Sequence, residues 1–246
     1  MRQFGLIGYP LSHSFSGSYF AKKFETEKIT DAKYDLFPLK SIDELPGLLS
    51  KQPNLKGLNV TIPYKQEVKQ YLSDLDDSAQ KVGAVNVIKI TKNQLTGYNS
   101  DYYGFKSSLL NWTGRSFANT VKALILGSGG AAKAVIAVFK DLEIPYLMIS
   151  RDHDKGDLTY QDLNKSTLQE HKLIINTTPL GMAPNTNKQP SIPYHLLGPD
   201  HYLYDLIYNP EETLFLKSGK KSGTEVKNGL EMLYLQAEKS WEIWNS

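Results

Sequence analysis

The sequence predicts an α/β protein of two domains, and three observations lead to this fold class. Segments with the composition of short strands alternate with helical segments from the N-terminus onward, as they do in parallel α/β sheets. Residues 121–126 are apolar apart from Lys122 and lead directly into a glycine-rich turn, and such runs are typical of strands covered on both faces. The chain has 246 residues, and a domain usually holds about 100–200.

The N-terminal part of the chain alternates strand and helix patterns. We expect strands at residues 4–8, 33–38 and 57–62. Composition and apolar spacing predict helices at residues 18–28, 42–50 and 66–72. Ser41 precedes the second of these helices and is a candidate N-cap. Residues 85–90 and 94–98 predict two paired strands, joined by a turn that contains Asn93.

The C-terminal part follows a break at residues 111–120, which are polar and predict a loop. After the strand at 121–126 we expect a helix to about residue 142, strands at 146–150, 173–176 and 202–206, and an amphipathic helix at 229–244. The first domain is therefore placed at 1–100 and a nucleotide-type domain at 101–228. We expect the last segment, 229–246, to pack back on the first domain.

The composition of the chain indicates which kinds of molecule the protein is expected to bind. The formal net charge is +2 and the basic residues are scattered, whereas phosphate backbones attract a basic stripe, so we expect no nucleic acid. No apolar run reaches the roughly 18–20 residues of a membrane span, and the apolar N-terminal stretch is too short for a signal peptide. The chain has no cysteine, which excludes disulfides and cysteine metal sites. We expect a cytoplasmic protein that acts on a small molecule, without a metal or a membrane partner.

A dinucleotide site is predicted where the strand at 121–126 meets the next helix. The turn contains Gly127, Ser128, Gly129, Gly130 and Ala131. Glycines permit the tight turn and let a pyrophosphate approach the backbone, and the helix N-terminus faces the phosphates. A glycine-rich turn without a ligand is the alternative, but the strand–turn–helix context favours binding.

The end of the following strand discriminates between the two nicotinamide cofactors. Enzymes that use NAD usually place an acidic residue there for the ribose 2′-hydroxyl. Here the strand ends in Ser150-Arg151, and a guanidinium suits a 2′-phosphate because it offers a planar fork of donors. A solvated surface arginine is the alternative, and Asp152 would repel a phosphate. With Lys155 as a second cation, we expect NADP.

Polar groups in the first domain predict proton transfer on a hydroxylated substrate. Lys65 ends the segment Asn59-Val60-Thr61-Ile62-Pro63-Tyr64-Lys65, and Asn86 and Asp101 lie beside later strands. Taken singly, Lys65 fits a solvated lysine, and Asn86 and Asp101 fit turn residues. Together they supply a cation, a carboxylate and neutral donors, a set that suits proton transfer to a carbonyl oxygen.

The segment after the first strand contains Ser14 and Ser16, whose hydroxyls could bind a carboxylate. A serine-rich turn with a helix cap is the alternative reading of these residues. We interpret His13 as structural rather than catalytic, since no carboxylate is near it in sequence and a Lys–Asp pair already covers the acid–base role.

Eight motifs in order resemble the shikimate dehydrogenase family. They are Gly-x-Pro-x-x-His-Ser-x-Ser, Asn-Val-Thr-Ile-Pro-x-Lys, Gly-Ala-Val-Asn, Asn-x-Asp-x-x-Gly, Gly-x-Gly-Gly-Ala-Ala, Asn-Thr-Thr-Pro-Leu-Gly-Met, Asp-Leu-Ile-Tyr-Asn-Pro and Gly-Leu-Glu-Met-Leu-x-x-Gln. They span nearly the whole chain.

The resemblance implies a substrate domain, a Rossmann-like NADP domain and an active site in the cleft between them. It implies reversible, NADPH-dependent reduction of 3-dehydroshikimate to shikimate, an oxidoreductase step of aromatic amino acid biosynthesis, by a monomer or homodimer. Lys65 would be the general acid–base, paired with Asp101. The substrate would be bound by Ser14, Ser16, Thr61, Asn86, Asp101, Tyr208 and Gln236. The cofactor would be bound by Asp77, Gly127, Ser128, Gly129, Gly130, Ala131, Ser150, Arg151, Lys155, Leu206 and Gly229.

The chain departs from the family pattern at three places. Gly17 stands where proline is usual, Val87 where threonine is common, and Ser150-Arg151-Asp152 replaces Asn-Arg-Thr. Three rivals remain open: a quinate/shikimate dehydrogenase that uses NAD, a non-catalytic ligand-binding module, and a folate-linked dehydrogenase. The intact Lys65 and Asp101 argue against the second rival, and the Ser14, Ser16 and Gln236 elements argue against the third.

Overall fold

The structure is a computed structural model that describes residues 1–11, 14–92 and 94–246. The chain divides into two compact units, one made of Met1–Tyr103 with Gln236–Ser246 and the other of Gly104–Leu235. The passages between them lie within two helices, α4 (Ser100–Ala118) and α8 (Leu230–Asn245). The domain boundaries expected from the sequence lay between residues 100 and 101 and between residues 228 and 229. His13 and Asn93 lie outside the described residues.

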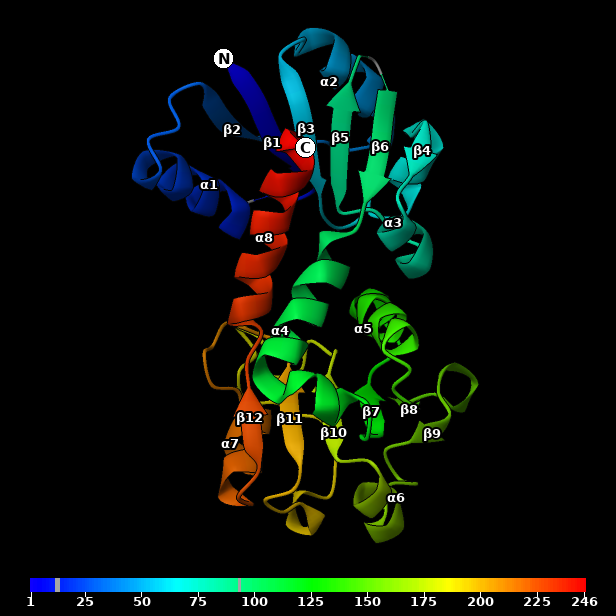
Figure 1. The fold of residues 1–246 in the computed structure, drawn as a ribbon. Coiled ribbons are helices and arrows are strands. Elements are labelled where there is room, and N and C mark those ends of the chain that lie inside the picture. The colour runs from blue at the N-terminus through cyan, green and yellow to red at the C-terminus, as the bar shows by residue number, and fades with distance from the viewer. Residues whose placement is uncertain (12–13, 93) are drawn as a thin grey trace. The chain divides into compact units, whose positions relative to one another are not determined.

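The first unit contains a six-stranded mixed sheet in the order β2-β1-β3-β5-β6-β4 (Figure 1). Strand β1 pairs in parallel with β2 and β3, while β5 is antiparallel to β3 and β6. The strands are β1 (Arg2–Gly8), β2 (Ala32–Pro38), β3 (Leu55–Val60), β4 (Asp74–Leu75), β5 (Val87–Thr91) and β6 (Gln94–Tyr98). The helices are α1 (Phe15–Thr26), α2 (Leu45–Lys51) and α3 (Asp77–Val82), with 3₁₀ turns at Ile42–Glu44 and Glu67–Tyr71.

Local signals account for several of these elements. Ser41 accepts a hydrogen bond from the Asp43 amide, and Glu44 reaches back to the Ser41 amide. This capping box satisfies donors that a helix start leaves without partners, so the predicted N-cap is confirmed. The expected paired strands at 85–90 and 94–98 are also confirmed, because β5 and β6 pair in antiparallel fashion.

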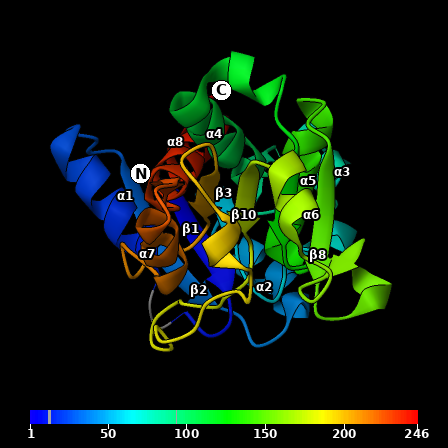
Figure 2. The same ribbon diagram turned by 90° about the horizontal axis from the view of Figure 1, so that it is seen from below.

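An aromatic cluster joins α1, the sheet and the end of α8 within the first unit. Helix α1 lies against β1 and β2 (Figures 1 and 2). The Phe4 ring stacks on Trp244 at 4.9 Å between centroids, and the Trp244 indole donates to the Ile88 carbonyl at 3.1 Å. A Cβ on Gly57 would lie 2.1 Å from the Trp244 ring, so only glycine lets the indole approach β3 so closely.

The second unit contains a six-stranded parallel sheet in the order β12-β11-β10-β7-β8-β9 (Figure 1). The strands are β7 (Ala123–Leu126), β8 (Tyr146–Ser150), β9 (Leu158–Thr159), β10 (Leu173–Asn176), β11 (Tyr202–Asp205) and β12 (Glu225–Lys227). The helices are α5 (Gly130–Asp141), α6 (Lys165–Glu170) and α7 (Leu214–Lys221), with 3₁₀ turns at His153–Lys155 and Tyr194–Leu196. The strands expected at 146–150 and 173–176 are confirmed.

The strand order of this second sheet locates its binding edge. Counted along the unit, the strands run 6-5-4-1-2-3, the order of doubly wound dinucleotide-binding folds. The order reverses between β7 and β10. In such sheets a ligand binds outside the carboxyl ends of the strands at this switch point, which here is flanked by the turns after Leu126 and Asn176.

One prediction about secondary structure was wrong. Residues 111–120 were expected to form a loop, but α4 extends to Ala118, with an interruption at Gly114 where φ is 76°. Trp112 and Phe117 pack on Tyr202 of β11, with ring centroids 5.5 and 4.4 Å apart. Burial of these rings stabilises a helix that the polar composition alone disfavours.

A buried carboxylate organises the ends of the central strands. Asp205 at the end of β11 is fully buried. It accepts hydrogen bonds from Asn176 Nδ2 at 3.0 Å, from the Ile207 amide at 3.1 Å and from the Thr213 hydroxyl at 2.6 Å. Burial raises the pKa of Asp205 to about 6, because desolvation disfavours the charged form.

The raised pKa predicts a defined pH dependence of stability. The unfolded chain holds the carboxyl at a pKa of about 3.9. Between that value and about 6 the folded state binds more protons, so this group's contribution to stability falls as pH rises. Asp205→Asn removes the titration. We expect the free energy of unfolding of the variant to gain on wild type by up to roughly 3 kcal/mol from pH 4 to pH 7, at about 1.4 kcal/mol per pKa unit.

Urea unfolding of both proteins across this pH range measures the effect. Asp154→Asn, which changes an exposed carboxylate of the same unit, is the control for a general charge effect. Parallel pH profiles for wild type and Asp205→Asn would contradict the assignment.

Candidate active site

Lys65 and Asp101, which were predicted to act as an acid–base pair, form an ion pair in the first unit. Lys65 Nζ donates to Asp101 Oδ2 at 2.7 Å, and the two side chains are 34% and 26% exposed. This partial burial strengthens the ion pair relative to a surface pair while leaving the ammonium open to a ligand. Asp101 lies in the first turn of α4, where the helix dipole favours a negative charge.

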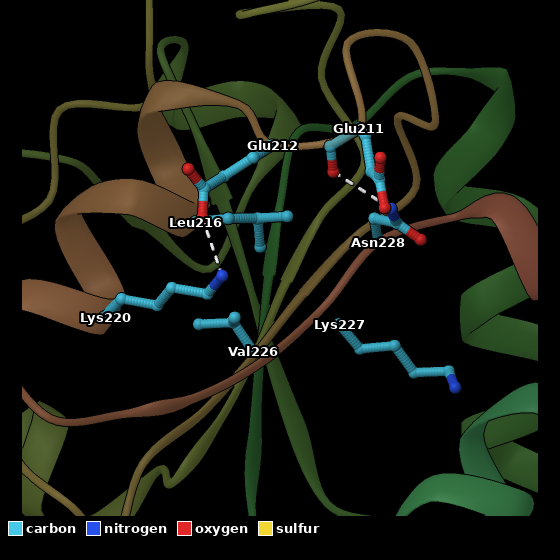
Figure 3. A pocket seen from close by; sticks show the side chains of 7 residues that line it. All are labelled: Glu211, Glu212, Leu216, Lys220, Val226, Lys227 and Asn228. Carbon is cyan, nitrogen blue, oxygen red and sulfur yellow. Dashed lines mark hydrogen bonds and ion pairs between the residues drawn. The ribbon is translucent and has the colours of Figure 1, made fainter.

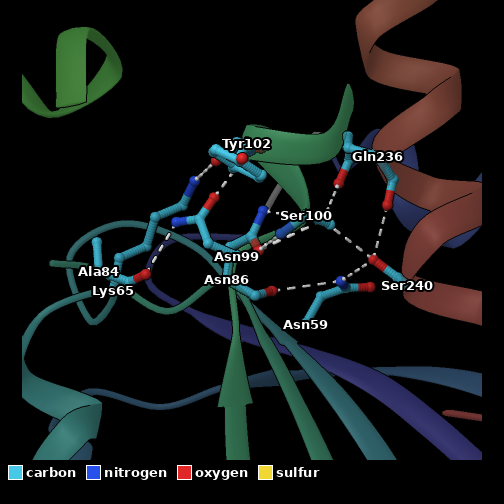
Figure 4. Close-up of polar contacts among 10 residues, drawn as sticks. Asn59, Lys65, Ala84, Asn86, Asn99, Ser100, Tyr102, Gln236 and Ser240 are labelled. Carbon is cyan, nitrogen blue, oxygen red and sulfur yellow. Dashed lines mark hydrogen bonds and ion pairs between the residues drawn. The ribbon is translucent and has the colours of Figure 1, made fainter. Parts of the chain in front are cut away.

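A network of buried amides and hydroxyls lies beside the pair (Figure 4). Asn86 Oδ1 accepts from the Ser100 amide at 2.6 Å. The Ser100 hydroxyl donates to Gln236 Oε1 at 3.2 Å. Asn59 Nδ2 donates to the Ser240 hydroxyl at 3.0 Å. The structure therefore brings together Asn86, Asp101, Lys65 and Gln236, all expected from the sequence.

Ser14 and Ser16 lie at the start of α1. Ser14 is the residue before the helix, but its side chain makes no capping bond. Its hydroxyl oxygen is buried and has no hydrogen-bond partner among the described residues. A buried hydroxyl without a hydrogen-bond partner is unusual. Ser16 lies beside the partly buried Tyr34, whose pKa is raised by burial and lowered in part by Ser16.

Tyr34 links the serine segment to the amide network. Burial raises the pKa of Tyr34, so the phenol stays protonated. Its hydroxyl donates to Asn59 Oδ1 at 2.8 Å. Thr61, which follows β3, is half-buried, and its amide donates to the Ile7 carbonyl at 2.9 Å. Sequence reasoning missed Tyr34 and Ser240, because no motif marks a partner that comes from another element.

The glycine turn of the second unit has the conformation that its residues predicted. Gly127 has a φ of +103°, and a Cβ there would lie 2.8 Å from Thr178 Cγ2. At Gly129 and Gly130 an added Cβ would meet open space. The helix α5 begins at Gly130 without a side-chain cap, so its first amides are available to an anion.

A pocket of about 550 Å³ lies at the carboxyl ends of β7, β8 and β10. Its walls come from the glycine turn, from the segment after β8 and from the turn after β10. The lining residues are Gly127, Ser128, Gly129, Ser150, Arg151, Asp152, Lys155, Tyr160, Thr177, Thr178, Pro179 and Leu180. Six cofactor residues expected from the sequence are thus brought together at the switch point, while Gly130 and Ala131 lie exposed at the start of α5.

Residues 151–155, which carry the charged side chains of this pocket, contain an ion pair of their own. Asp152 Oδ2 lies 3.2 Å from Lys155 Nζ, and Asp152 also accepts from the Asp154 amide at 3.2 Å. The hydrogen bond from Lys155 holds the pKa of Asp152 below its usual value, so the carboxylate stays ionised. Arg151 is exposed and lines the pocket.

Three more residues expected to bind the cofactor, Asp77, Leu206 and Gly229, also lie outside this pocket, as does Tyr208, which was expected to bind the substrate. Asp77 belongs to the first unit, where it forms an ion pair with Lys81 at 2.7 Å. Leu206 and Gly229 contact each other after β11 and β12, and a Cβ on Gly229 would lie 2.1 Å from the Leu206 carbonyl oxygen. Tyr208 is 40% exposed and belongs to the second unit.

A second pocket, of about 420 Å³, lies between α7 and β12 (Figure 3). Several of its polar groups are already bonded, and Lys227 pairs with Glu231, which does not line the pocket. Lys220 Nζ lies 2.6 Å from Glu212 Oε1, and Asn228 Nδ2 donates to the Glu211 carbonyl at 2.9 Å. We assign no ligand to it.

Within residues 1–11, 14–92 and 94–246, acidic and histidine side chains do not gather in a group of three that could hold a metal ion. In the same stretches, none of the helices has the length and apolar character needed to cross a membrane.

The strand order, the glycine turn and the pocket define the second unit as a dinucleotide-binding type of α/β fold. Residues 6–88 match the family model described as the shikimate dehydrogenase substrate binding domain. An NADP(+) shikimate dehydrogenase of Clostridium beijerinckii is 42% identical over 99% of this chain and 92% of its own length. The chain belongs to the shikimate dehydrogenase family.

Solved structures agree with this assignment. The shikimate 5-dehydrogenase of Listeria monocytogenes, in complex with shikimate and NAD, has a TM-score of 0.88 at 27% identity and covers 100% of this chain and 92% of its own. The shikimate 5-dehydrogenase of Thermus thermophilus, in complex with NADP(H) and shikimate, has a TM-score of 0.83 at 27% identity, with 99% and 93% covered.

The unsatisfied hydroxyl of Ser14 predicts an unusual response to substitution. Ser14→Ala removes a buried polar atom that loses no hydrogen bond, so we expect the free energy of unfolding to be unchanged or higher. The matched variant is Ser78→Ala, because the buried Ser78 hydroxyl donates to Asp76 and accepts from the Asn99 amide. It should lose about 1–3 kcal/mol. Equal losses in urea unfolding would contradict the difference.

Proposed function

We propose that this chain is an NADP-dependent shikimate dehydrogenase that reversibly reduces 3-dehydroshikimate to shikimate. The observation that carries the proposal is the half-buried Lys65–Asp101 ion pair at 2.7 Å beside a network of buried amides. Membership of the family supports the choice of substrate. The reaction belongs to the biosynthesis of chorismate and the aromatic amino acids. We assign the protein to the cytoplasm, as a monomer or a homodimer.

Lys65 is assigned as the general acid–base. NADPH, when bound, supplies the hydride to the C3 carbonyl carbon. Negative charge then develops on the carbonyl oxygen, and the Lys65 ammonium stabilises this charge and donates a proton to the oxygen. In the oxidation of shikimate the neutral amine accepts that proton. Asp101 holds the ammonium by its 2.7 Å hydrogen bond and accepts from a neighbouring hydroxyl of the substrate.

The first unit is assigned to the substrate. Ser14 and Ser16 bind the ring carboxylate, an assignment supported by the unsatisfied Ser14 hydroxyl. A charged acceptor makes stronger hydrogen bonds with such donors than a neutral one does. The ring hydroxyls are assigned to Thr61, Asn86, Asp101 and Gln236, with Tyr208 as a further contact.

The second unit is assigned to NADP, and its residues fit the group. The open space at Gly129 and Gly130 admits a pyrophosphate, and the uncapped start of α5 offers it amide donors. Arg151 and Lys155 offer cations to the 2′-phosphate. Ser128, Ser150 and Ala131 complete the cofactor set, together with Asp77, Leu206 and Gly229.

A rate assay tests the proposal. Shikimate and quinate, each with NADP and NAD, should be followed by the absorbance of the reduced nicotinamide. We expect kcat/KM to be highest for shikimate with NADP. A higher value for quinate with NAD would favour the quinate/shikimate alternative, and no turnover with any pair would favour a non-catalytic module.

Lys65→Ala tests the acid–base role. Loss of the proton donor should lower kcat by about 10²–10⁴-fold, the range for general acid–base groups. Shikimate binding, measured by calorimetry, should change far less. The control is Lys69→Ala, which removes an exposed lysine of the same segment. A folded Lys65→Ala enzyme with near-normal kcat would exclude the role.

Arg151→Ala tests the choice of cofactor. The variant should lose about 1.5–3 kcal/mol of interaction with NADP, because a hydrogen-bonded ion pair to the 2′-phosphate is removed. NAD should be almost unaffected. The measurement is kcat/KM for each cofactor in wild type and variant. Equal losses on both cofactors, or a wild type that favours NAD, would contradict the role of Arg151.

A substitution of Asp152 should change the cofactor preference in the opposite direction to Arg151→Ala. The neutral variant Asp152→Asn removes a charge that repels a phosphate and that is paired with Lys155. We expect its preference for NADP over NAD to exceed that of wild type in the same assay. An unchanged preference would place Asp152 outside the influence of the 2′-phosphate.

A further inference from the structure

The buried side chain of Asn99 bridges two segments of the first unit. Asn99 is 1% exposed and lies between β6 and α4. Its Nδ2 donates to the Ala84 carbonyl at 2.8 Å, and its Oδ1 accepts from the Tyr102 amide at 3.1 Å. Figure 4 shows these two bonds on either side of the amide. The second bond caps α4, the helix that carries Asp101.

The segment that Asn99 contacts also holds the backbone of Lys65. Val85 follows Ala84, and its amide donates to the Lys65 carbonyl at 2.7 Å. Val85 is fully buried, so this peptide unit is held firmly. Lys65 Nζ in turn binds Asp101. These contacts form a closed ring. It runs from the Lys65 carbonyl to the peptide between Ala84 and Val85, from there to the Asn99 side chain, and along the first turn of α4 to Asp101. The hydrogen bond from Lys65 Nζ to Asp101 closes it.

We propose that Asn99 is a positioning residue for the acid–base pair, a proposal that rests on the role proposed above for Lys65 and Asp101. Its amide sets the distance between the backbone of Lys65 and the first turn of α4. The 2.7 Å contact at the reactive end depends on that distance, because a long lysine side chain alone does not define where its ammonium lies.

The chemistry of the side chain explains why asparagine is needed. The amide offers a donor and an acceptor at the same reach. Serine can cap the helix, but it is too short to bridge both groups. Aspartate can cap the helix as well, but when ionised it has no donor for the Ala84 carbonyl. Asn99→Ser therefore removes one bond of the ring and keeps the helix cap.

A double-mutant cycle tests the proposal in the full-length enzyme. Asn99→Ser should lower kcat for shikimate oxidation by about 10- to 100-fold, the loss that a small misplacement causes. In the Asp101→Asn enzyme the pair is already lost, so the same substitution should change kcat by less than about threefold. Equal fold losses in both backgrounds would show that Asn99 is merely structural and would overturn the proposal.

Asn164→Ser is the matched control. Asn164 caps α6 in the second unit and accepts from the Thr167 amide at 3.1 Å. Asn164→Ser is the same substitution at the same helix position as Asn99→Ser, but among the described residues Asn164 makes no hydrogen bond with the segments that hold Lys65. We expect kcat to be unchanged. A loss of kcat equal to that of Asn99→Ser would point to a general effect of helix capping and would overturn the proposal.

Chemical labelling gives a readout that does not require turnover. Acetic anhydride modifies exposed amines, and peptide mass spectrometry measures the rate at each lysine. Asn99→Ser should speed labelling of Lys65 several-fold, toward the rate in Asp101→Asn, while the exposed Lys69 serves as the internal reference. An unchanged rate at Lys65 would overturn the proposal. Absence of shikimate oxidation by wild type would instead count against the proposed function alone.

Discussion

A polar group buried away from water must find a partner, and this constraint shapes both units. In the first unit, Asn59, Asn86 and Asn99 are between 1% and 6% exposed, and each has its amide engaged at both ends. The partners come from β2, α4 and α8 as well as from neighbouring loops. Satisfying the amides therefore fixes the elements that carry Lys65 and Asp101.

The same constraint acts in the second unit through a carboxylate. Asp205 binds Asn176 Nδ2, and Asn176 Oδ1 accepts from the Thr178 amide and hydroxyl at 3.0 and 2.7 Å. Thr178 lines the pocket beside Gly127. A hydrogen-bonded chain thus supports one wall of the nucleotide pocket from within the sheet. Among the described residues, the buried hydroxyls of Ser14 and Thr224 are without a hydrogen-bond partner. Ser14 lies where a ligand is proposed, as does the open backbone at Gly129.

Much of the site could be predicted from the sequence because its chemistry lies in short, contiguous segments. The glycine turn follows an apolar strand, and Lys65 ends a polar segment, so type and spacing suffice. The pairing of Asp152 with Lys155 is also local, three residues apart. Tyr34 and Ser240 could not be predicted as partners of Asn59, since 25 and 181 residues separate them from it.

Secondary structure was likewise predicted where the signal is local and missed where it depends on contacts with distant residues. Short apolar runs identified the central strands of the second sheet, because β7 is apolar throughout and β10 is apolar up to its last residue, Asn176. The helix at 111–118 was missed because its stability comes from Trp112 and Phe117 packing on β11, a contact that local composition does not encode. The short edge strands β4, β9 and β12 have too few residues to show any alternation.

The contact of Trp244 with Gly57 and Phe4 has a consequence for biosynthesis. The first unit is discontinuous, since its aromatic cluster combines residues near the N-terminus with Ala237, Ile243 and Trp244. On the ribosome, the early strands emerge long before these residues are made. The second unit, which is contiguous, has all its parts available sooner. Until translation reaches residue 244, the rings of Phe4 and Phe20 lack their contact with Trp244, and the nascent chain carries an aromatic surface that the finished fold buries.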